Sequence, residues 1–355
     1  MRIAVLGAGK IGAAIVELLA SSGDYAVTVA DKDQALLDAL GRDDMAREAF
    51  DLSDAGRLRA FLSGAEAVVS ALPYYLNTTV AESARAAGVH YFDLTEDVST
   101  TRRARAIAAE ATAAFVPQCG LAPGFVSIVA MDLATRFDRL EAVRMRVGAL
   151  PKYPTNALSY NLTWSTDGLI NEYCNPCEAI HEGRRMEVLP LEGIEHFSLD
   201  GIAYEAFNTS GGLGTLAETL DGRVSELNYK TVRYPGHCER MQLLVHELKL
   251  GERRALFKDV LETAIPMTLQ DVVLIFVTVT GWRGGRLMQE SYAAKIYAQA
   301  IGGRIWSAIQ VTTAAGVCAM VDLVRDGRIP PRGFIRQEDV ALPLFLGNRF
   351  GRYYA

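Results

Sequence analysis

The chain opens with a glycine-rich turn of the kind that binds phosphates. Gly7, Gly9 and Gly12 form a G-x-G-x-x-G pattern between an apolar run at 3–6 and residues 11–19, whose apolar positions recur at helical spacing. The first glycine permits a tight turn, the second lets the backbone approach a pyrophosphate, and the third lets the helix pack on the strand. The helix N-terminus then offers unpaired N–H groups and the positive end of its dipole. The pattern predicts a dinucleotide site rather than a glycine turn without a ligand.

A carboxylate is expected at the ribose end of this site. Asp31 ends the next predicted strand, 26–30, and follows Gly12 by about 20 residues, the spacing at which an acidic residue contacts the adenine ribose. Such a carboxylate accepts hydrogen bonds from the ribose hydroxyls and repels a 2′-phosphate. Asp31 therefore favours NAD over NADP, although Lys32 beside it weakens that preference.

Ligands of an open parallel sheet bind beyond the carboxyl ends of its strands. Tyr74, Tyr75, Asp93 and Glu96 follow such ends and are candidates for the nicotinamide half, although the tyrosines could equally be packing residues. The complete set of cofactor-binding candidates is Gly7, Gly9, Lys10, Ile11, Gly12, Asp31, Lys32, Asp51, Leu52, Ala71, Leu72, Pro73, Thr95 and Gly120.

Strands and helices alternate over residues 1–120. Strands are predicted at 3–6, 26–30, 46–50, 67–71, 91–94 and 115–116, and helices at 11–19, 55–62, 79–87 and 104–113. This alternation predicts βαβ units and a doubly wound parallel sheet, the Rossmann arrangement, with helices on both faces. From Pro123 the residue pattern predicts an α+β domain, with strands at 143–147, 187–188, 196–199 and 271–280. A late helix is expected at 309–323, ending at Asp326 and Gly327.

Length and composition bound the class of protein. A chain of 355 residues favours two domains. With 36 Lys and Arg against 42 Asp and Glu, the net charge of −6 disfavours a nucleic-acid-binding surface. Five cysteines disfavour a disulfide-stapled secreted fold. We find neither a signal peptide nor a run of about 18 apolar residues, so a cytoplasmic protein without a membrane segment is expected.

Several motifs together resemble the saccharopine dehydrogenase-like reductases. They are the glycine turn and the segments 70–73, 120–124, 164–169, 231–237 and 312–316, which extend over nearly the whole chain. Within that family the segment 147–152 and the Tyr-Pro-Gly-His stretch at 234–237 are most similar to L-lysine 6-dehydrogenases.

The resemblance implies a Rossmann domain at 1–122, a substrate and dimerisation domain with a mixed sheet at 123–307, and a C-terminal helix and tail at 308–355 that return to the Rossmann domain. It also implies NAD(P)-dependent oxidation at a C–N bond of a lysine-pathway compound. Glutamate-forming saccharopine reductases carry an acidic residue where this chain has Ala122, and a cysteine near Gly148. Both departures favour lysine over saccharopine as the substrate.

Oxidative deamination of a primary amine requires a neutral amine, because an ammonium group has no lone pair to assist hydride departure. The site must deprotonate it or bind it neutral in a desolvated pocket. His237, with an expected pKa near neutrality, is the candidate general base, with a structural role in a Pro-Gly turn as the alternative. Asp93 and Glu96 could hold the amine or orient the attacking water. Lys230, if burial lowers its pKa, and Tyr74 complete the catalytic candidates.

The distal amino-acid end of the substrate needs a group that pairs with its carboxylate. Arg233 is our candidate, because a guanidinium pairs bidentately with a carboxylate and the family's substrate-binding arginine falls here. The alternative for Arg233 is a structural salt bridge. Tyr160 and Trp164 are candidates for the walls of the aliphatic chain, although residues spaced by four are often core. Tyr75 completes the substrate-binding set.

No metal site is expected. Cys174 and Cys177 form a lone C-x-x-C without a partner motif, and isolated structural thiols are the favoured account. Three functions stay open: an NAD-dependent L-lysine dehydrogenase that releases ammonia, a saccharopine dehydrogenase, and a cofactor-binding regulator without turnover. The resemblance and the extended second sheet suggest a homodimer. The expected substrate is a small amino acid.

Overall fold

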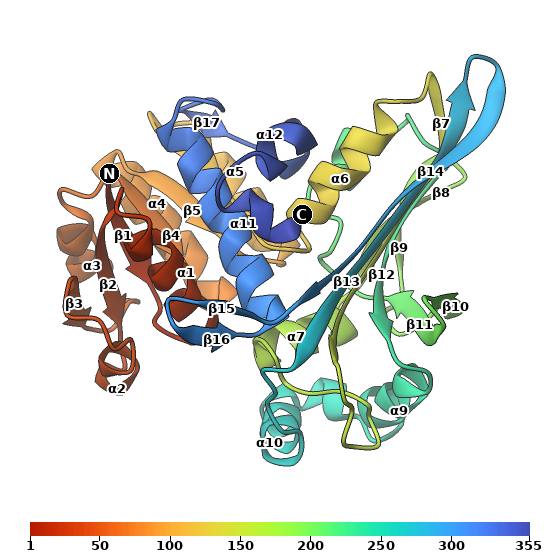
Figure 1. Cartoon of the computed structure of the whole chain (residues 1–355), viewed down its shortest axis with the longest axis horizontal. Coiled ribbons are helices and arrows are strands. Elements are labelled where there is room, and N and C mark those ends of the chain that lie inside the picture. The colour runs from red at the N-terminus through yellow and green to blue at the C-terminus, as the bar shows by residue number, and fades with distance from the viewer. The chain divides into compact units, whose positions relative to one another are not determined.

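Strands and helices alternate along the first part of the chain in the computed structural model, which describes all 355 residues (Figure 1). In order, these elements are β1 (Arg2–Leu6), α1 (Lys10–Ser21), β2 (Ala26–Asp31), α2 (Gln34–Asp38), β3 (Ala46–Ala49), α3 (Ala55–Leu62), β4 (Ala67–Ser70), the short helix η1 (Tyr74–Leu76), α4 (Asn77–Ala87), β5 (His90–Asp93), α5 (Val98–Ala108) and β6 (Ala114–Val116). The predicted βαβ alternation is confirmed.

The sheet of this part is parallel throughout and doubly wound. Its seven strands follow the order β17-β6-β5-β4-β1-β2-β3, so the winding reverses between β1 and β4. The edge strand β17 (Gly333–Phe334) comes from the C-terminal part and was not predicted. One face carries α3, α4 and α5 over a buried apolar cluster that includes Leu58, Val68, Val80 and Phe115. The carboxyl ends of β1 and β2 meet at one edge of the sheet, where the glycine turn lies.

The chain divides into two compact units. Unit 1 consists of Met1–Phe125, Ala300–Arg304 and Gln310–Ala355, and unit 2 of Val126–Gln299 and Ile305–Ile309. The C-terminal elements of unit 1 are most of α11 (Ala308–Arg325), β17, η4 (Gln337–Asp339), α12 (Leu342–Leu346) and η5 (Gly351–Tyr354).

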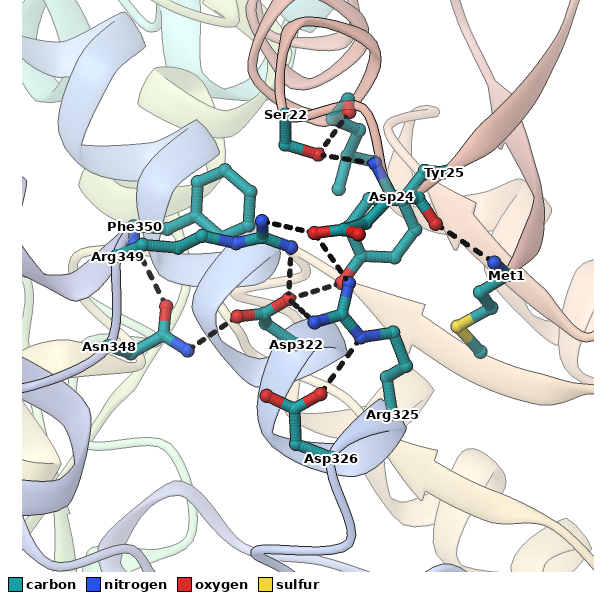
Figure 2. A network of polar contacts seen from close by, with 11 residues as sticks. Met1, Ser22, Asp24, Tyr25, Asp322, Arg325, Asp326, Asn348, Arg349 and Phe350 are labelled. Atoms are coloured by element: carbon teal, nitrogen blue, oxygen red, sulfur yellow. Dashed lines mark hydrogen bonds and ion pairs between the residues drawn. The ribbon is translucent and has the colours of Figure 1, made fainter.

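A polar network fastens these C-terminal elements within unit 1 (Figure 2). The buried carboxylate of Asp322 accepts hydrogen bonds from Tyr25 Oη at 2.6 Å, Asn348 Nδ2 at 2.8 Å and Arg349 Nη2 at 2.7 Å. Asp24 pairs with Arg349 at 2.5 Å and with Arg325 at 3.4 Å. The network joins α11 and the chain end to the turn before β2.

The helix α11 is long and apolar enough to cross a membrane by length and composition alone, with a mean hydropathy of 1.3 over 18 residues. However, 89% of that window is buried inside the protein. Its apolar side chains are therefore explained by the core.

Unit 2 is an α+β arrangement around a mixed sheet. Its strands are β7 (Arg139–Pro151), β8 (Cys177–His181), β9 (Arg184–Val188), β10 (Glu195–Leu199), β11 (Ile202–Asn208), β12 (Glu226–Arg233), β13 (Asp271–Arg283) and β14 (Arg286–Tyr297). The order is β10-β11-β12-β7-β13-β14, with β8 pairing with β12 and β9. The contact of β12 with β7 is parallel and the other contacts are antiparallel. The mixed sheet that the resemblance implied is confirmed.

The helices of unit 2 are α6 (Phe125–Ala134), α7 (Thr166–Cys174), α8 (Leu216–Thr219), α9 (His237–Gln242), η2 (Leu243–Glu247), η3 (Leu250–Glu252) and α10 (Arg254–Ala264). A buried cluster joins α7, α9 and α10 through Leu169, Tyr173, Met241, Phe257 and neighbouring apolar residues. Two short strands, β15 (Gln299–Ile301) and β16 (Arg304–Trp306), form a separate pair.

The helix predicted at 104–113 is displaced in the structure. α5 begins at Val98 because the side chain of Asp97 caps it, accepting a hydrogen bond from the Thr100 N–H at 2.7 Å. It ends at Ala108, so the alanine-rich run 109–113 lies beyond it. The prediction of a strand at 143–147 found only the middle of β7, which has 13 residues.

Candidate functional sites

The glycine turn of unit 1 has the geometry that the sequence predicted. Gly7 has a φ of +96°, and a Cβ there would lie 2.8 Å from the Ala71 carbonyl oxygen. A Cβ at Gly12 would overlap the Gly7 carbonyl, so this position must stay bare for α1 to pack. A Cβ at Gly9, in contrast, would meet no protein atom within 4 Å. Gly7 and Gly12 are therefore required by the fold, whereas Gly9 leaves open space beside the backbone.

The N-terminus of α1 can accept a pyrophosphate. Its capping residue is Gly9, so no side chain bonds the first N–H groups, and the first turn carries no acidic residue. Unpaired helix N–H groups and the helix dipole favour an anion here. The site therefore has the chemistry that NAD(P) requires.

Asp31 lies at the end of β2, directly beside the glycine turn. Its Oδ2 accepts a hydrogen bond from the Ala8 N–H at 2.7 Å and its Oδ1 accepts one from the Asp33 N–H at 2.9 Å. These two bonds fix the direction of the carboxylate, and each oxygen keeps a further lone pair for a hydroxyl. Asp31 can thus receive ribose hydroxyls without moving.

The other cofactor candidates divide by exposure. Lys10, Lys32, Asp51 and Pro73 are exposed, and Gly9, Ile11, Ala71 and Leu72 are half-buried. The side chain of Leu52 belongs to the apolar cluster beneath α3 and α4, so only its backbone could contact a cofactor. Thr95 and Gly120 are buried, and the Thr95 hydroxyl accepts a hydrogen bond from the Asp97 N–H at 3.1 Å.

Asp93 is a structural carboxylate rather than a catalytic one. It is completely buried, and it accepts hydrogen bonds from Tyr91 Oη at 2.5 Å, the Thr95 N–H at 3.0 Å and the Gln118 N–H at 2.9 Å. Burial raises its pKa. These bonds tie the ends of β5 and β6 together and leave no oxygen facing a ligand, which corrects the expectation that Asp93 holds the amine.

Three other candidates of unit 1 lie nearer the surface. Glu96 is half-buried in the loop before α5. Tyr74 is half-buried in η1, and Tyr75 is 64% exposed, with their rings in edge contact at 5.8 Å. Neither tyrosine belongs to the buried core. The exposure of Tyr75 therefore argues against the alternative that it is a packing residue.

Unit 2 brings Arg233 and His237 together around a residue that the sequence did not single out, Tyr173. Arg233 Nε lies 2.9 Å from Tyr173 Oη, and Tyr173 Oη lies 3.0 Å from His237 Nε2. The other ring nitrogen, His237 Nδ1, lies 2.8 Å from the Leu158 carbonyl oxygen. All three side chains are at most 2% exposed.

His237 is neutral in this setting. Burial, followed by the positive charge of Arg233, lowers its pKa from 6.5 to about 3. A histidine with this pKa does not hold a proton near neutrality, and Tyr173 already occupies its Nε2. The expectation of a near-neutral pKa is therefore wrong, because the sequence could not show complete burial beside a cation.

Two of the three guanidinium nitrogens of Arg233 make hydrogen bonds, Nε to Tyr173 and Nη1 to a backbone carbonyl. Nη1 donates to the Val232 carbonyl at 2.9 Å, whereas Nη2 lies 4.0 Å from Glu172 Oε2, beyond hydrogen-bond distance. The guanidinium also lies over the Tyr160 ring, 4.9 Å from its centre. A buried cation and a buried carboxylate thus form a long ion pair, which agrees with the structural salt bridge considered as the alternative for Arg233.

Tyr160 and Trp164 are in contact with this cluster. Trp164 Nε1 donates to Tyr160 Oη at 3.1 Å, and the Tyr160 ring is in edge contact with His237 at 5.4 Å. The two residues belong to a loop before α7 and not to a helix. Their spacing of four is therefore not a helical repeat.

Lys230 does not join the cluster. Side chains alternate along a strand, so Lys230 and Arg233 of β12 point to opposite faces of the sheet. Lys230 Nζ pairs with Glu195 Oε2 at 3.0 Å, and Arg146, its register partner on β7, pairs with the same carboxylate. Lys230 is thus part of an ion-pair network remote from His237, which corrects its place among the catalytic candidates.

The sequence missed Tyr173, Glu172 and Glu205. Ser165 caps α7 by accepting a hydrogen bond from the Gly168 N–H at 3.2 Å, and Leu169, Ile170 and Tyr173 are buried at helical spacing. A serine cap followed by this spacing was the available signal for a buried helix face.

The cysteines and histidines show no reactive or metal-binding arrangement. Burial raises the pKa of the Cys174 thiol, and raises that of Cys177 to about 12. No group of three or more His, Cys, Asp or Glu side chains is placed to hold a metal ion.

A parallel doubly wound sheet with a dinucleotide turn, continued by a mixed-sheet unit, is the architecture of an NAD(P)-binding oxidoreductase. The family model described as saccharopine dehydrogenase NADP binding domain matches residues 3–119, and the saccharopine dehydrogenase C-terminal domain matches residues 120–346. The chain belongs to the saccharopine dehydrogenase family, and its cofactor is NAD(P).

Two solved structures share the fold over most of the chain. Saccharopine dehydrogenase (L-Glu forming) from Saccharomyces cerevisiae is 18% identical, with a TM-score of 0.77, covering 97% of this chain and 95% of that one. Homospermidine synthase from Legionella pneumophila, in complex with NAD, is 13% identical, with a TM-score of 0.70, covering 99% of this chain and 89% of that one.

Proposed function

We propose that the protein is an NAD-dependent dehydrogenase that deaminates L-lysine at its ε-amine. Lysine, NAD⁺ and water would give 2-aminoadipate 6-semialdehyde, ammonium, NADH and a proton. NAD⁺, when bound, supplies the acceptor for the hydride that leaves the ε-carbon. The observation that carries the proposal is the buried ion pair of unit 2, in which Arg233 Nη2 lies 4.0 Å from Glu172 Oε2, beyond hydrogen-bond distance.

This pair matches the α-amino-acid end of lysine. The guanidinium can pair with the α-carboxylate, and Glu172 can receive the α-ammonium group. Both groups are at least 93% buried, so a zwitterion would exchange water for a strong pair of complementary charges. Recognition of the α-amino acid head leaves the distal ε-amine as the reacting group.

We do not assign His237 as the base for the reacting amine. Its Nε2 already lies 3.0 Å from Tyr173 Oη, and Tyr160, Tyr173 and Phe207, each at most 1% exposed, surround its ring. We therefore assign deprotonation of the ε-amine to the alkaline range of pH, and not to proton uptake by His237.

Saccharopine is the less favoured substrate. The dicarboxylate arm that distinguishes saccharopine from lysine needs a further cation. Arg233 is the cation that is hydrogen-bonded within the buried cluster. The nearby Arg240 is exposed and donates to the Gly236 carbonyl.

A substrate panel tests the proposal. Purified protein with NAD⁺ at alkaline pH should form NADH, followed by its absorbance, with L-lysine alone. If lysine were inert and NADH were instead consumed with the semialdehyde and glutamate together, the activity would be that of a saccharopine dehydrogenase. Inertness in both directions would contradict both substrates.

Asp31 supports NAD as the preferred cofactor. Replacing Asp31 by alanine should raise the ratio of kcat/KM for NADP to that for NAD about tenfold, because a 2′-phosphate would no longer face a carboxylate. Asp33→Ala is the matched control, since it removes an exposed carboxylate that caps α2 two residues away. An unchanged ratio in Asp31→Ala would show that Asp31 does not contact the ribose.

We further propose a cytoplasmic homodimer formed through unit 2. The edge strand β14 leaves Leu287, Met288 and Tyr297 at least 36% exposed, and an unpaired edge of 12 residues can pair with a second copy. All five cysteines are free thiols, which suits a reducing compartment. Light scattering should give twice the chain mass; a monomer mass at every concentration would contradict the dimer.

A further inference from the structure

Tyr173 lies at the centre of the buried cluster of unit 2, between Arg233 and His237. Its side chain is completely buried on α7 and is in edge contact with the Phe207 ring at 5.9 Å. Its hydroxyl is 2.9 Å from Arg233 Nε and 3.0 Å from His237 Nε2. The hydroxyl therefore makes both of the hydrogen bonds that connect the arginine with the histidine.

The direction of every bond in this chain is fixed by its two ends. A guanidinium can only donate, so Arg233 Nε–H donates to Tyr173 Oη. A carbonyl can only accept, so His237 Nδ1 must carry a hydrogen and donate to Leu158. His237 is neutral, which leaves Nε2 without a hydrogen, and the Tyr173 O–H donates to it.

We propose that Tyr173 is a positioning residue, which holds His237 in the Nδ1–H tautomer together with the Leu158 carbonyl and fixes the orientation of Arg233 towards a substrate carboxylate. The tautomer follows from the hydrogen-bond chain and the neutral state of His237. The effect on the carboxylate rests on the proposed function.

Glu205 fixes the backbone of the same histidine. Its carboxylate is 1% exposed and accepts hydrogen bonds from the Gly236 and Cys238 N–H groups, both at 2.6 Å. Glu205 is also the register partner of Arg233 in the pairing of β11 with β12. The ring and the backbone of His237 are thus held independently, so loss of the Tyr173 hydroxyl would remove the hydrogen bond at Nε2, leave the one at Nδ1 and not release the turn.

The substitution Tyr173→Phe removes this hydroxyl and keeps the ring. Arg233 Nε and His237 Nε2 would both lose their partners, and a hydrogen bond to a charged group contributes enough for about a tenfold effect. We expect KM for L-lysine to rise about tenfold, with a smaller change in kcat. Tyr229→Phe is the matched control, because Tyr229 is another buried tyrosine of unit 2 whose hydroxyl takes no part in this chain.

The tautomer itself gives a test that does not depend on activity. The chain has five histidines, so ¹⁵N-histidine labelling and nuclear magnetic resonance can resolve them, with His237→Gln assigning the signal. The wild type at pH 7 should show His237 with its hydrogen on Nδ1, Tyr229→Phe should keep this pattern, and Tyr173→Phe should lose or alter it. A hydrogen on Nε2 in the wild type, or an unaltered pattern in Tyr173→Phe, would overturn the proposal.

The experiments distinguish failure of the positioning role of Tyr173 from failure of the proposed function. Lysine turnover with an Nε2–H histidine would leave the proposed function standing and reject the role of Tyr173. An Nδ1–H histidine that depends on Tyr173, in a protein inert towards lysine, would support the positioning role and reject lysine as the substrate.

Discussion

Replacing Arg233 by lysine is expected to raise KM for L-lysine about 100-fold, a loss of about 2.7 kcal/mol of binding free energy. A lysine keeps the positive charge but cannot donate to Tyr173, to the Val232 carbonyl and to a carboxylate from one planar group. The effect should be specific for substrates with a carboxylate. Cadaverine, which is lysine without its carboxyl group, should be used poorly by the wild type, with little further change in the variant. Steady-state kinetics with both amines measures this.

Arg146→Lys is the control for this substitution. Arg146 is also buried in the unit 2 sheet and also pairs with a carboxylate, that of Glu195, but it lies on the opposite face of the sheet from Arg233. Its replacement should leave KM for lysine within about twofold of the wild type. An equal rise in KM for both variants, or none in Arg233→Lys, would mean that Arg233 does not bind the carboxylate.

Acidification from pH 6.5 towards pH 5 is expected to destabilise the protein through His237. Its pKa is lowered from 6.5 in the unfolded chain to about 3 in the folded one. Between these values the unfolded state binds a proton that the folded state excludes, so the free energy of unfolding falls as pH falls. One such group contributes about 1.4 kcal/mol per pH unit, or about 2 kcal/mol over this interval.

Urea denaturation at pH 7 and pH 5 measures this contribution when variants are compared. His237→Gln cannot take up the proton, so its stability should fall less over this interval than that of the wild type. His246→Gln, which changes an exposed histidine of the same unit, should retain the wild-type dependence. Identical slopes for His237→Gln and the wild type would show that His237 titrates normally in the folded protein.

Local patterns were sufficient for the strands β1 to β6 of unit 1. The alternation of buried strands with amphipathic helices predicted every strand from β1 to β6, because neighbouring strands of a parallel sheet follow one another in the chain. α5 was misplaced because its start depends on the Asp97 cap, and the alanines after it fit a helix equally well. β17 has two residues and pairs with β6 from more than 200 positions away, so no local signal could reveal it.

Unit 2 was less predictable because its pairings are not local. β12 lies parallel to β7, about 80 residues earlier, and β11 and β12 carry polar residues that blur their alternation. The strand β13 was predicted well, since its β-branched run is long and buried over most of its length.

The two candidate sites also differ in whether their residues are close together or far apart in the sequence. The glycine turn and Asp31 belong to one βαβ unit, so their spacing alone brings them together. Tyr173 contacts Arg233 and His237, which are 60 and 64 residues away in the chain. The lowered pKa of His237 depends on its burial and on the charge of Arg233, which the sequence alone does not show. Asp93 was proposed from its place just past a strand and Lys230 from its residue type. The sequence could not show that Asp93 is buried and bonded to Tyr91, or that Lys230 faces the side of the sheet opposite to Arg233.

The central claim is that the enzyme breaks the ε C–N bond of lysine, and nitrogen labelling tests it most directly. L-lysine labelled with ¹⁵N at the ε position, and separately at the α position, would be incubated with the protein and NAD⁺ at alkaline pH. The released ammonia would then be analysed by mass spectrometry beside the NADH formed. We predict one labelled ammonia per NADH from the ε-labelled substrate and unlabelled ammonia from the α-labelled one. Label from the α position, or NADH formed without ammonia, would contradict the account.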